Sequence, residues 1–112
     1  MRWHPVADLG DLREGEVIGR ECEGRAIALY RIDGAFYATA GKCTHANACL
    51  AEGEVVEGHV ECPLHFGLFD IRTGRAAGAP VTVDLKTYPV RVEDGVISIG
   101  LDEDPDAAPD EA

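Results

Sequence analysis

The chain has 112 residues and carries 21 acidic side chains against 10 basic ones, which gives a formal net charge of -11 at pH 7. The length allows one small domain, and the few basic residues disfavour a nucleic-acid-binding protein, because neutralising phosphates requires clustered lysine and arginine. No apolar run approaches the roughly 20 residues of a membrane-spanning helix, and the start of the chain lacks the apolar segment of a secretion signal. We therefore expect a soluble, cytoplasmic protein.

The first predicted element is a β-hairpin. Residues 25–32 and 35–40 are strand-like runs joined by Asp33-Gly34, and an Asp-Gly pair between two apolar runs is the strongest short-range hairpin signal. A different block follows at about residues 41–80. It is rich in glycine and turn residues and contains a small predicted hairpin around Glu57-Gly58.

A further hairpin is predicted near the end of the chain, where residues 88–93 and 96–99 flank Asp94-Gly95. No stretch keeps an apolar period of about 3.6 residues over a dozen residues, so no long helix is expected. The pattern predicts an all-β fold, a sandwich of hairpins into which the block at residues 41–80 is inserted.

The inserted block contains two short chelating motifs. Cys43-Thr44-His45 is followed, after sixteen residues, by Cys62-Pro63-Leu64-His65. Each motif offers one thiolate and one imidazole, which together are the ligand set of a [2Fe-2S] cluster in which two histidines replace two cysteines on one iron. Structural zinc is the rival, although zinc fingers usually hold both cysteines in one chelate and both histidines in the other. The predicted metal ligands are Cys43, His45, Cys62 and His65.

The residues around both motifs, 41–46 and 61–70, resemble the Rieske family. Within that family the chain is most similar to the small ferredoxins that serve bacterial aromatic ring-hydroxylating dioxygenases of the naphthalene and biphenyl types. The resemblance extends from about Trp3 to Leu101. It implies the Rieske iron-sulfur fold, in which antiparallel sheets form a base sandwich with an inserted cluster-binding subdomain, and a single domain at residues 1–101.

The resemblance also implies a role. A Rieske ferredoxin carries one electron at a time on one Rieske [2Fe-2S] cluster, from a flavin-dependent NAD(P)H reductase to the terminal oxygenase, and is a monomer. The sequence agrees, because it contains no G-x-G-x-x-G motif after a strand and no evident 2-His-1-carboxylate iron site. We therefore expect no catalytic residues. The alternatives are an accessory subunit of a nitrite-reductase-type complex, many of which lack the ligands, and a zinc-stabilised interaction module.

Further residues around the motifs acquire roles through the resemblance. His45 and His65 would bind iron through Nδ1 and present Nε2 to solvent as the electron exit, and the loop containing Pro80 would cover the cluster. Leu64, Phe66 and Pro80 would form an apolar collar around these histidines, the alternative for Phe66 being a place in the core. Pro63 and Gly67 are turn residues that free backbone N–H groups for the bridging sulfurs.

The mixed ligand set bears on the reduction potential. Two thiolates balance the charge of an oxidised cluster core, whereas four would leave a dianion, so the potential lies in the Rieske range of roughly -150 to +300 mV. High-potential members of the family carry hydroxyl groups where this chain has Gly67 and Phe69, and disulfide cysteines where it has Ala48 and Leu64. The resemblance therefore implies a potential near the bottom of the range.

Two cysteines and the C-terminal segment remain. We interpret Cys22 and Cys49 as thiols outside any disulfide, in keeping with a reducing compartment. Residues 102–112 carry six acidic side chains and no basic one, so a disordered tail is expected. The tail either steers the protein toward basic partner surfaces or only keeps it soluble.

Replacing Cys43 or Cys62 with serine is expected to abolish cluster binding and, because metal binding is coupled to folding, to destabilise both loops. Replacing His45 or His65 with cysteine exchanges a neutral ligand for an anionic one, so any cluster that assembles should have a markedly lower reduction potential. Iron and sulfide analysis and voltammetry measure the two effects. A purified Cys62→Ser protein with full iron and sulfide content would contradict the assignment.

Overall fold

The computed structural model describes residues 2–42, 49–63, 67–77 and 84–101. Within these ranges the regular elements are β-strands and two 3-10 helices, which confirms the predicted all-β class. The strands are β1 (Arg2–Asp8), β2 (Val17–Cys22), β3 (Arg25–Ile32), β4 (Ala35–Ala40), β5 (Glu54–Val56), β6 (His59–Glu61), β7 (Leu68–Asp70), β8 (Thr87–Tyr88), β9 (Val90–Glu93) and β10 (Val96–Leu101). The 3-10 helices are η1 (Leu9–Asp11) and η2 (Leu50–Glu52).

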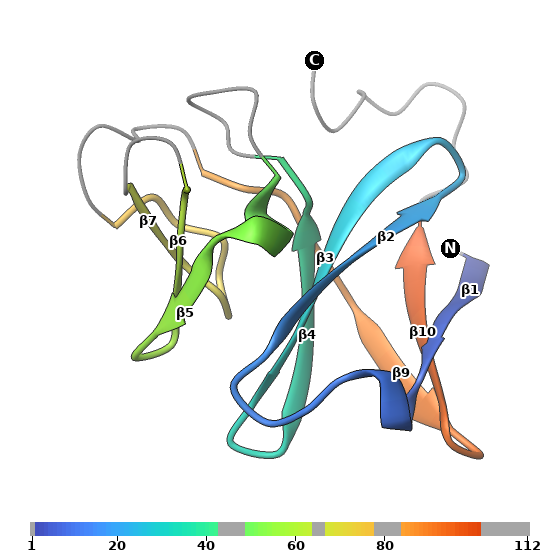
Figure 1. The fold of residues 1–112 in the computed structure, drawn as a ribbon. Coiled ribbons are helices and arrows are strands. Elements are labelled where there is room, and N and C mark those ends of the chain that lie inside the picture. The colour runs from blue at the N-terminus through green and yellow to red at the C-terminus, as the bar shows by residue number, and fades with distance from the viewer. Residues whose placement is uncertain (1, 43–48, 64–66, 78–83, 102–112) are drawn as a thin grey trace.

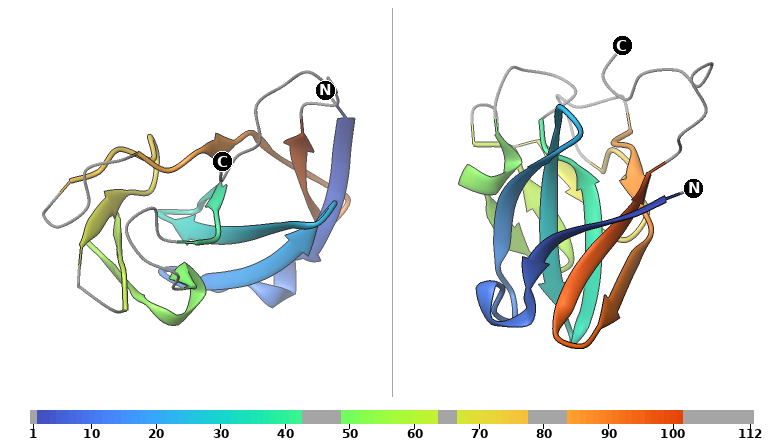
Figure 2. Two further views of the ribbon diagram at one scale, coloured as in Figure 1. Left: turned by 90° about the horizontal axis from the view of Figure 1, so that it is seen from above. Right: turned by 90° about the vertical axis from the view of Figure 1, so that its right-hand side faces the viewer.

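The strands form three antiparallel sheets. A four-stranded sheet has the order β2-β3-β4-β8, and two three-stranded sheets have the orders β1-β10-β9 and β5-β6-β7. The four-stranded sheet lies between the other two, as two perpendicular views show (Figures 1 and 2). The sheet β5-β6-β7 lies within the block that the sequence predicts as the inserted subdomain.

Strand β3 is buried on both faces because its sheet lies between the other two (Figure 1). Ile27 and Leu29 pack into a core with Ile97 and Ile99 of β10. The alternate residues of β3, including Tyr30, pack into a second core together with side chains from the sheet β5-β6-β7. This double burial explains why the sequence of β3 is nearly continuous in apolar residues rather than strictly alternating.

The predicted hairpin turns are confirmed. Asp33 and Gly34 have φ angles of 51° and 78°, and Asp94 and Gly95 have 51° and 78°. Positive φ at both central residues is the conformation that lets a two-residue turn follow the right-handed twist of its strands. The turn at Glu57-Gly58 has the same form, with φ angles of 47° and 79°, and joins β5 to β6.

One strand prediction is wrong. Residues 88–93 were expected to form a single strand, but Pro89 divides them, since proline has no N–H to donate to a ladder. Tyr88 pairs with Ala38 of β4, whereas β9 pairs with β10. The Pro89 carbonyl accepts the Gly100 N–H at 3.0 Å, so the chain passes from one sheet to the other at this residue.

Strands β1, β2 and β7 are not predicted by the sequence pattern. Strand β1 contains a proline and a register shift between Pro5 and Ala7, which break its apolar alternation. It nevertheless pairs along its length with β10, so that Arg2 lies opposite Leu101. The first and last described strands therefore lie side by side (Figure 2).

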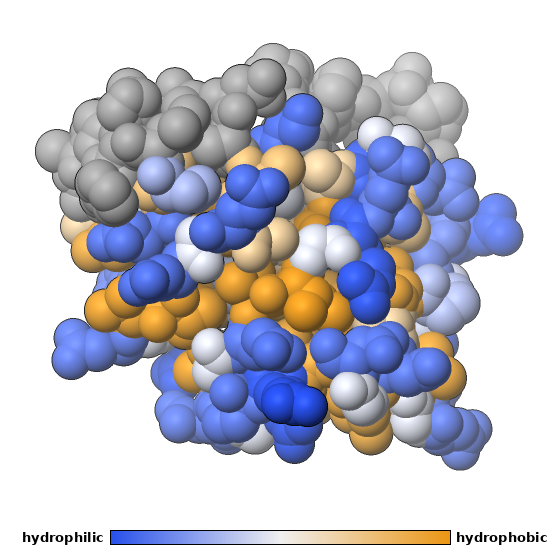
Figure 3. Space-filling view, in the orientation of Figure 1, coloured by the Kyte–Doolittle hydropathy of each residue, from blue (hydrophilic) through white to orange (hydrophobic). Residues whose placement is uncertain are grey.

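The face seen in Figure 3 is mixed in polarity. Figure 3 shows one face, on which hydrophilic residues predominate while apolar surface gathers at the centre and over the β5-β6 hairpin. Val56 in this hairpin is 40 % exposed, and among the described residues only Val92 is a second exposed large hydrophobic side chain. None of the described helices has the length and apolar composition needed to span a membrane.

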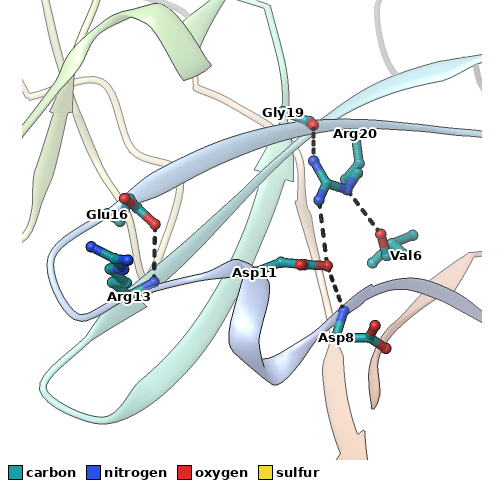
Figure 4. Close-up of polar contacts among 7 residues, drawn as sticks. All are labelled: Val6, Asp8, Asp11, Arg13, Glu16, Gly19 and Arg20. Carbon is teal, nitrogen blue, oxygen red and sulfur yellow. Dashed lines mark hydrogen bonds and ion pairs between the residues drawn. The ribbon is translucent and has the colours of Figure 1, made fainter. Parts of the chain in front are cut away.

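Arg20 links the middle sheet to the sheet that contains β1 (Figure 4). Its Nε donates to the Val6 carbonyl at 3.1 Å, and its Nη1 donates to the Gly19 carbonyl at 2.9 Å. Its Nη2 lies 3.6 Å from an oxygen of Asp11, which also accepts the Asp8 N–H at 3.0 Å. One guanidinium therefore joins β1, η1 and β2.

Replacing Arg20 with methionine keeps the aliphatic stem but removes the three donor contacts. Because the side chain is partly exposed, we expect the free energy of unfolding to fall by only about 1 kcal/mol. The matched control is Arg13→Met, since the Arg13 guanidinium is exposed and makes none of the contacts drawn in Figure 4. Urea unfolding of both variants measures the difference, and equal stabilities would show that Arg20 does not hold the sheets together.

Candidate metal centre

The described residues on either side of the first predicted ligand motif are joined by backbone hydrogen bonds. The Gly41 N–H donates to the Ala26 carbonyl at 2.8 Å, and the Leu50 N–H donates to the Gly41 carbonyl at 2.8 Å. Lys42 and Cys49 form an isolated antiparallel bridge. The chain therefore has fixed end points immediately before and after positions 43–48.

Gly41 is required by the close approach of two backbones. A Cβ atom at this position would lie 2.9 Å from both the Ala26 carbonyl carbon and the Ile27 nitrogen, closer than real Cβ atoms come. This role of Gly41 is not among those predicted from the sequence. A glycine two residues before Cys43 could have indicated that two backbone segments approach each other closely at the start of the motif.

The second motif also begins and ends at paired residues. The Cys62 N–H donates to the Gly67 carbonyl at 2.8 Å. Directly below this bond, Glu61 pairs with Leu68, and Val60 pairs with Phe69. Positions 64–66 are thus flanked by the end of β6 and the start of β7, which are neighbours in one sheet.

Cys62 is the predicted ligand that the structure describes. Its side chain is fully buried, with an exposed fraction of 0 %, in the core that also contains Leu50, Tyr30 and Phe69. Cys49 is exposed, whereas Cys22 is buried in the other core. Among the described residues, neither is joined in a disulfide. The apolar surroundings of Cys62 fit a thiolate ligand to the inner, solvent-shielded iron of a Rieske cluster.

Several predicted site residues lie outside the described ranges. These are the ligands Cys43, His45 and His65, together with Ala48, Leu64, Phe66 and Pro80. Among the described residues no group of three or more His, Cys, Asp or Glu side chains could hold a metal ion, as expected when three of the four predicted ligands lie elsewhere. The complete ligand set therefore stays a prediction.

The other predicted residues near the motif are described. Pro63 is half-buried in a turn, as its turn composition predicts, and Gly67 is buried. Phe69 is fully buried in the core that contains Cys62. The proposed contacts of these residues with cluster sulfurs stay predictions.

The segments that flank Pro80 are joined by hydrogen bonds to β7 and to each other. The Ala77 N–H donates to the Leu68 carbonyl at 2.8 Å, and Ala76 forms an isolated bridge with Phe69. The Ala76 N–H donates to Asp84 Oδ1 at 2.8 Å. The described ends of the second and third predicted loops are thus connected through β6 and β7, whereas those of the first loop are hydrogen-bonded to each other and to β3.

Comparisons with known proteins agree with this geometry. Residues 2–89 match the family described as the Rieske [2Fe-2S] domain. The ferredoxin component of the naphthalene 1,2-dioxygenase system of Pseudomonas putida is 44% identical over 101 residues, which cover 90% of this chain and 97% of that protein.

Two solved structures are similar over most of the chain. The ferredoxin of Sphingomonas yanoikuyae B1 has a TM-score of 0.85 and 36% identity, and the match covers 90% of this chain and 100% of that one. A complex of reduced oxygenase and oxidised ferredoxin in carbazole 1,9a-dioxygenase has a chain with a TM-score of 0.82 and 36% identity, covering 87% of this chain and 91% of that one.

Replacing Phe69 with tyrosine, alone and together with Gly67→Ser, tests how the surroundings of Cys62 set the reduction potential. A hydroxyl that donates to a cluster sulfur or a thiolate stabilises the added negative charge, so the potential should rise. Protein-film voltammetry measures the change, with Phe36→Tyr in the other core as control.

An unpartnered buried hydroxyl would destabilise the protein by about 1 to 3 kcal/mol, so folding is verified first by circular dichroism. Gly67→Ser alone decides nothing if it fails to fold. A folded Phe69→Tyr, Gly67→Ser double variant with an unchanged or lower potential would show that these positions do not tune the centre.

Proposed function

The chain belongs to the Rieske [2Fe-2S] domain family, and on this basis we propose that it is the ferredoxin of a multicomponent aromatic ring-hydroxylating dioxygenase system. The observation that carries the proposal is the match over 97% of the length of a ferredoxin component of such a system. A match of this extent leaves no catalytic domain unaccounted for in that relative. The protein is thus an electron carrier rather than the oxygenase.

The proposed cluster ligands are Cys43, His45, Cys62 and His65. The cluster supplies a site that accepts and returns one electron. The chain contributes two anionic and two neutral ligands, and the buried position of Cys62 at the end of β6 keeps water from its thiolate. His45 and His65 are the proposed exit for the electron.

The proposed partners are a flavoprotein reductase that oxidises NAD(P)H and a terminal ring-hydroxylating oxygenase. A solved complex of oxygenase with ferredoxin in carbazole 1,9a-dioxygenase contains a chain similar to this one, which supports the second partner. The reductase follows from the need for an electron donor, because the sequence has no nucleotide-binding motif of its own. We place the carrier in the cytoplasm as a monomer.

The proposed organisation is one Rieske domain at residues 1–101, with the cluster-binding subdomain at about residues 41–80 and an acidic tail at residues 102–112. The sheet β5-β6-β7 and the hydrogen bonds at the ends of the predicted loops support the proposed subdomain. Two complete chelating motifs disfavour the accessory subunit of a nitrite-reductase-type complex, since many such subunits lack the ligands.

Reconstitution tests the proposed function. The purified protein should contain about two iron and two sulfide per chain and give an electron paramagnetic resonance signal after reduction with dithionite. Added to the reductase and terminal oxygenase of a naphthalene 1,2-dioxygenase system, it should restore NADH oxidation that depends on aromatic substrate. Cys62→Ser is the matched control and should restore none.

Two results would overturn the proposal. A colourless protein that contains zinc and gives no signal would be the zinc-stabilised module. A protein that carries the cluster and accepts an electron from dithionite, but neither takes electrons from the reductase nor passes them to the oxygenase, would not be a dioxygenase ferredoxin.

A further inference from the structure

Two hydroxyl groups are buried inside the core that contains Cys62. Tyr30 and Thr39 both have exposed fractions of 0 %, and Tyr30 Oη lies 2.8 Å from Thr39 Oγ1. Thr39 Oγ1 donates to the Ala40 carbonyl at 2.8 Å. Since a threonine hydroxyl has one proton, the Tyr30 O–H must be the donor to Thr39. The result is a directed chain of hydrogen bonds from Tyr30 through Thr39 to Ala40.

The direction of this chain does not change with pH. Burial raises the pKa of Tyr30 well above its ordinary value. The Tyr30 hydroxyl therefore stays protonated and remains a donor in the neutral range.

The chain of hydrogen bonds ends where the first predicted ligand loop begins. Ala40 is the last residue of β4, and Gly41 and Lys42 lead to Cys43. In the peptide group between Ala40 and Gly41, the carbonyl oxygen accepts the Thr39 hydroxyl and the N–H donates to the Ala26 carbonyl. Both polar atoms of this peptide are thereby fixed.

The other end of the chain lies in the core beneath the second motif. Tyr30 belongs to the core cluster that includes Cys62, Phe69 and Leu50. Leu50 follows the first loop, and its N–H donates to the Gly41 carbonyl. The ring of Tyr30 therefore packs in the core of the second motif while its hydroxyl acts on the entry of the first.

A purely structural role does not require these hydroxyls. Phenylalanine in place of Tyr30 and valine in place of Thr39 would fill nearly the same volume. Burying a hydroxyl costs free energy of desolvation, and its hydrogen bonds do little more than offset that cost. What the polar pair adds is a defined geometry, because hydrogen bonds are directional and apolar contacts are not.

We propose that Tyr30 and Thr39 are positioning residues that fix the entry of the first ligand loop relative to Cys62, and so set the reduction potential and lifetime of the cluster. The inference rests on the proposed function, because it takes Cys43 and Cys62 as the two thiolate ligands. It assigns a redox role to a pair of core residues that are not themselves ligands.

The test uses full-length protein carrying its cluster and the variants Tyr30→Phe, Thr39→Val and Thr39→Ser. Tyr30→Phe and Thr39→Val should alter the electron paramagnetic resonance spectrum and raise the reduction potential, since a loosened loop entry admits water near the Cys62 thiolate. Loss of the cluster to an iron chelator should be several-fold faster. Thr39→Ser keeps the hydroxyl and should restore the parent values.

Tyr88→Phe is the matched control. It removes the same single oxygen from a buried tyrosine, but Tyr88 packs in the core on the opposite face of the middle sheet. This variant should keep the spectrum, the potential and the rate of cluster loss of the parent, even where its thermal stability changes.

The inference fails if Tyr30→Phe and Thr39→Val keep the parent spectrum and potential, whatever they do to thermal stability. If Thr39→Val does not fold, Tyr30→Phe decides, because it removes one oxygen and no volume. A parent protein without an iron-sulfur cluster would overturn the proposed function instead. The two failures are therefore distinguishable.

Discussion

The double burial of β3 is the constraint on which the rest of the structure depends. Ile27 and Leu29 lie in one core and Tyr30 in the other, so a single strand joins the sheet β1-β10-β9 to the sheet β5-β6-β7. Neither three-stranded sheet could bury its apolar face alone. The stability of the predicted cluster-binding block is therefore linked to that of the base.

This coupling has a consequence for the metal centre. The described ends of the ligand loops are held by backbone hydrogen bonds, such as those from Cys62 to Gly67 and from Leu50 to Gly41. Backbone pairing of this kind leaves less conformational entropy to be lost when the proposed cluster binds.

The two cores also separate different tasks. The core toward the base contains Ile97 and Ile99 opposite β3, together with Cys22 and Tyr88. The core toward the metal centre contains the thiol of Cys62 and the hydroxyls of Tyr30 and Thr39. Polar groups are placed in a core at an energetic cost, and the hydrogen-bonded pair of Tyr30 and Thr39 lies on the side where geometry matters for the proposed function.

The sequence by itself determined the features that depend on neighbouring residues. The Asp-Gly and Glu-Gly turns require positive φ angles that few other residue pairs adopt, and the two motifs fix the kind of metal ligand regardless of the fold. Tertiary structure alone decided the division of residues 88–93 at Pro89, the pairing of Arg2 with Leu101, and the contact of Tyr30 with Thr39. These depend on which distant segments meet, and neither turn chemistry nor hydrophobic periodicity encodes the partner of a strand.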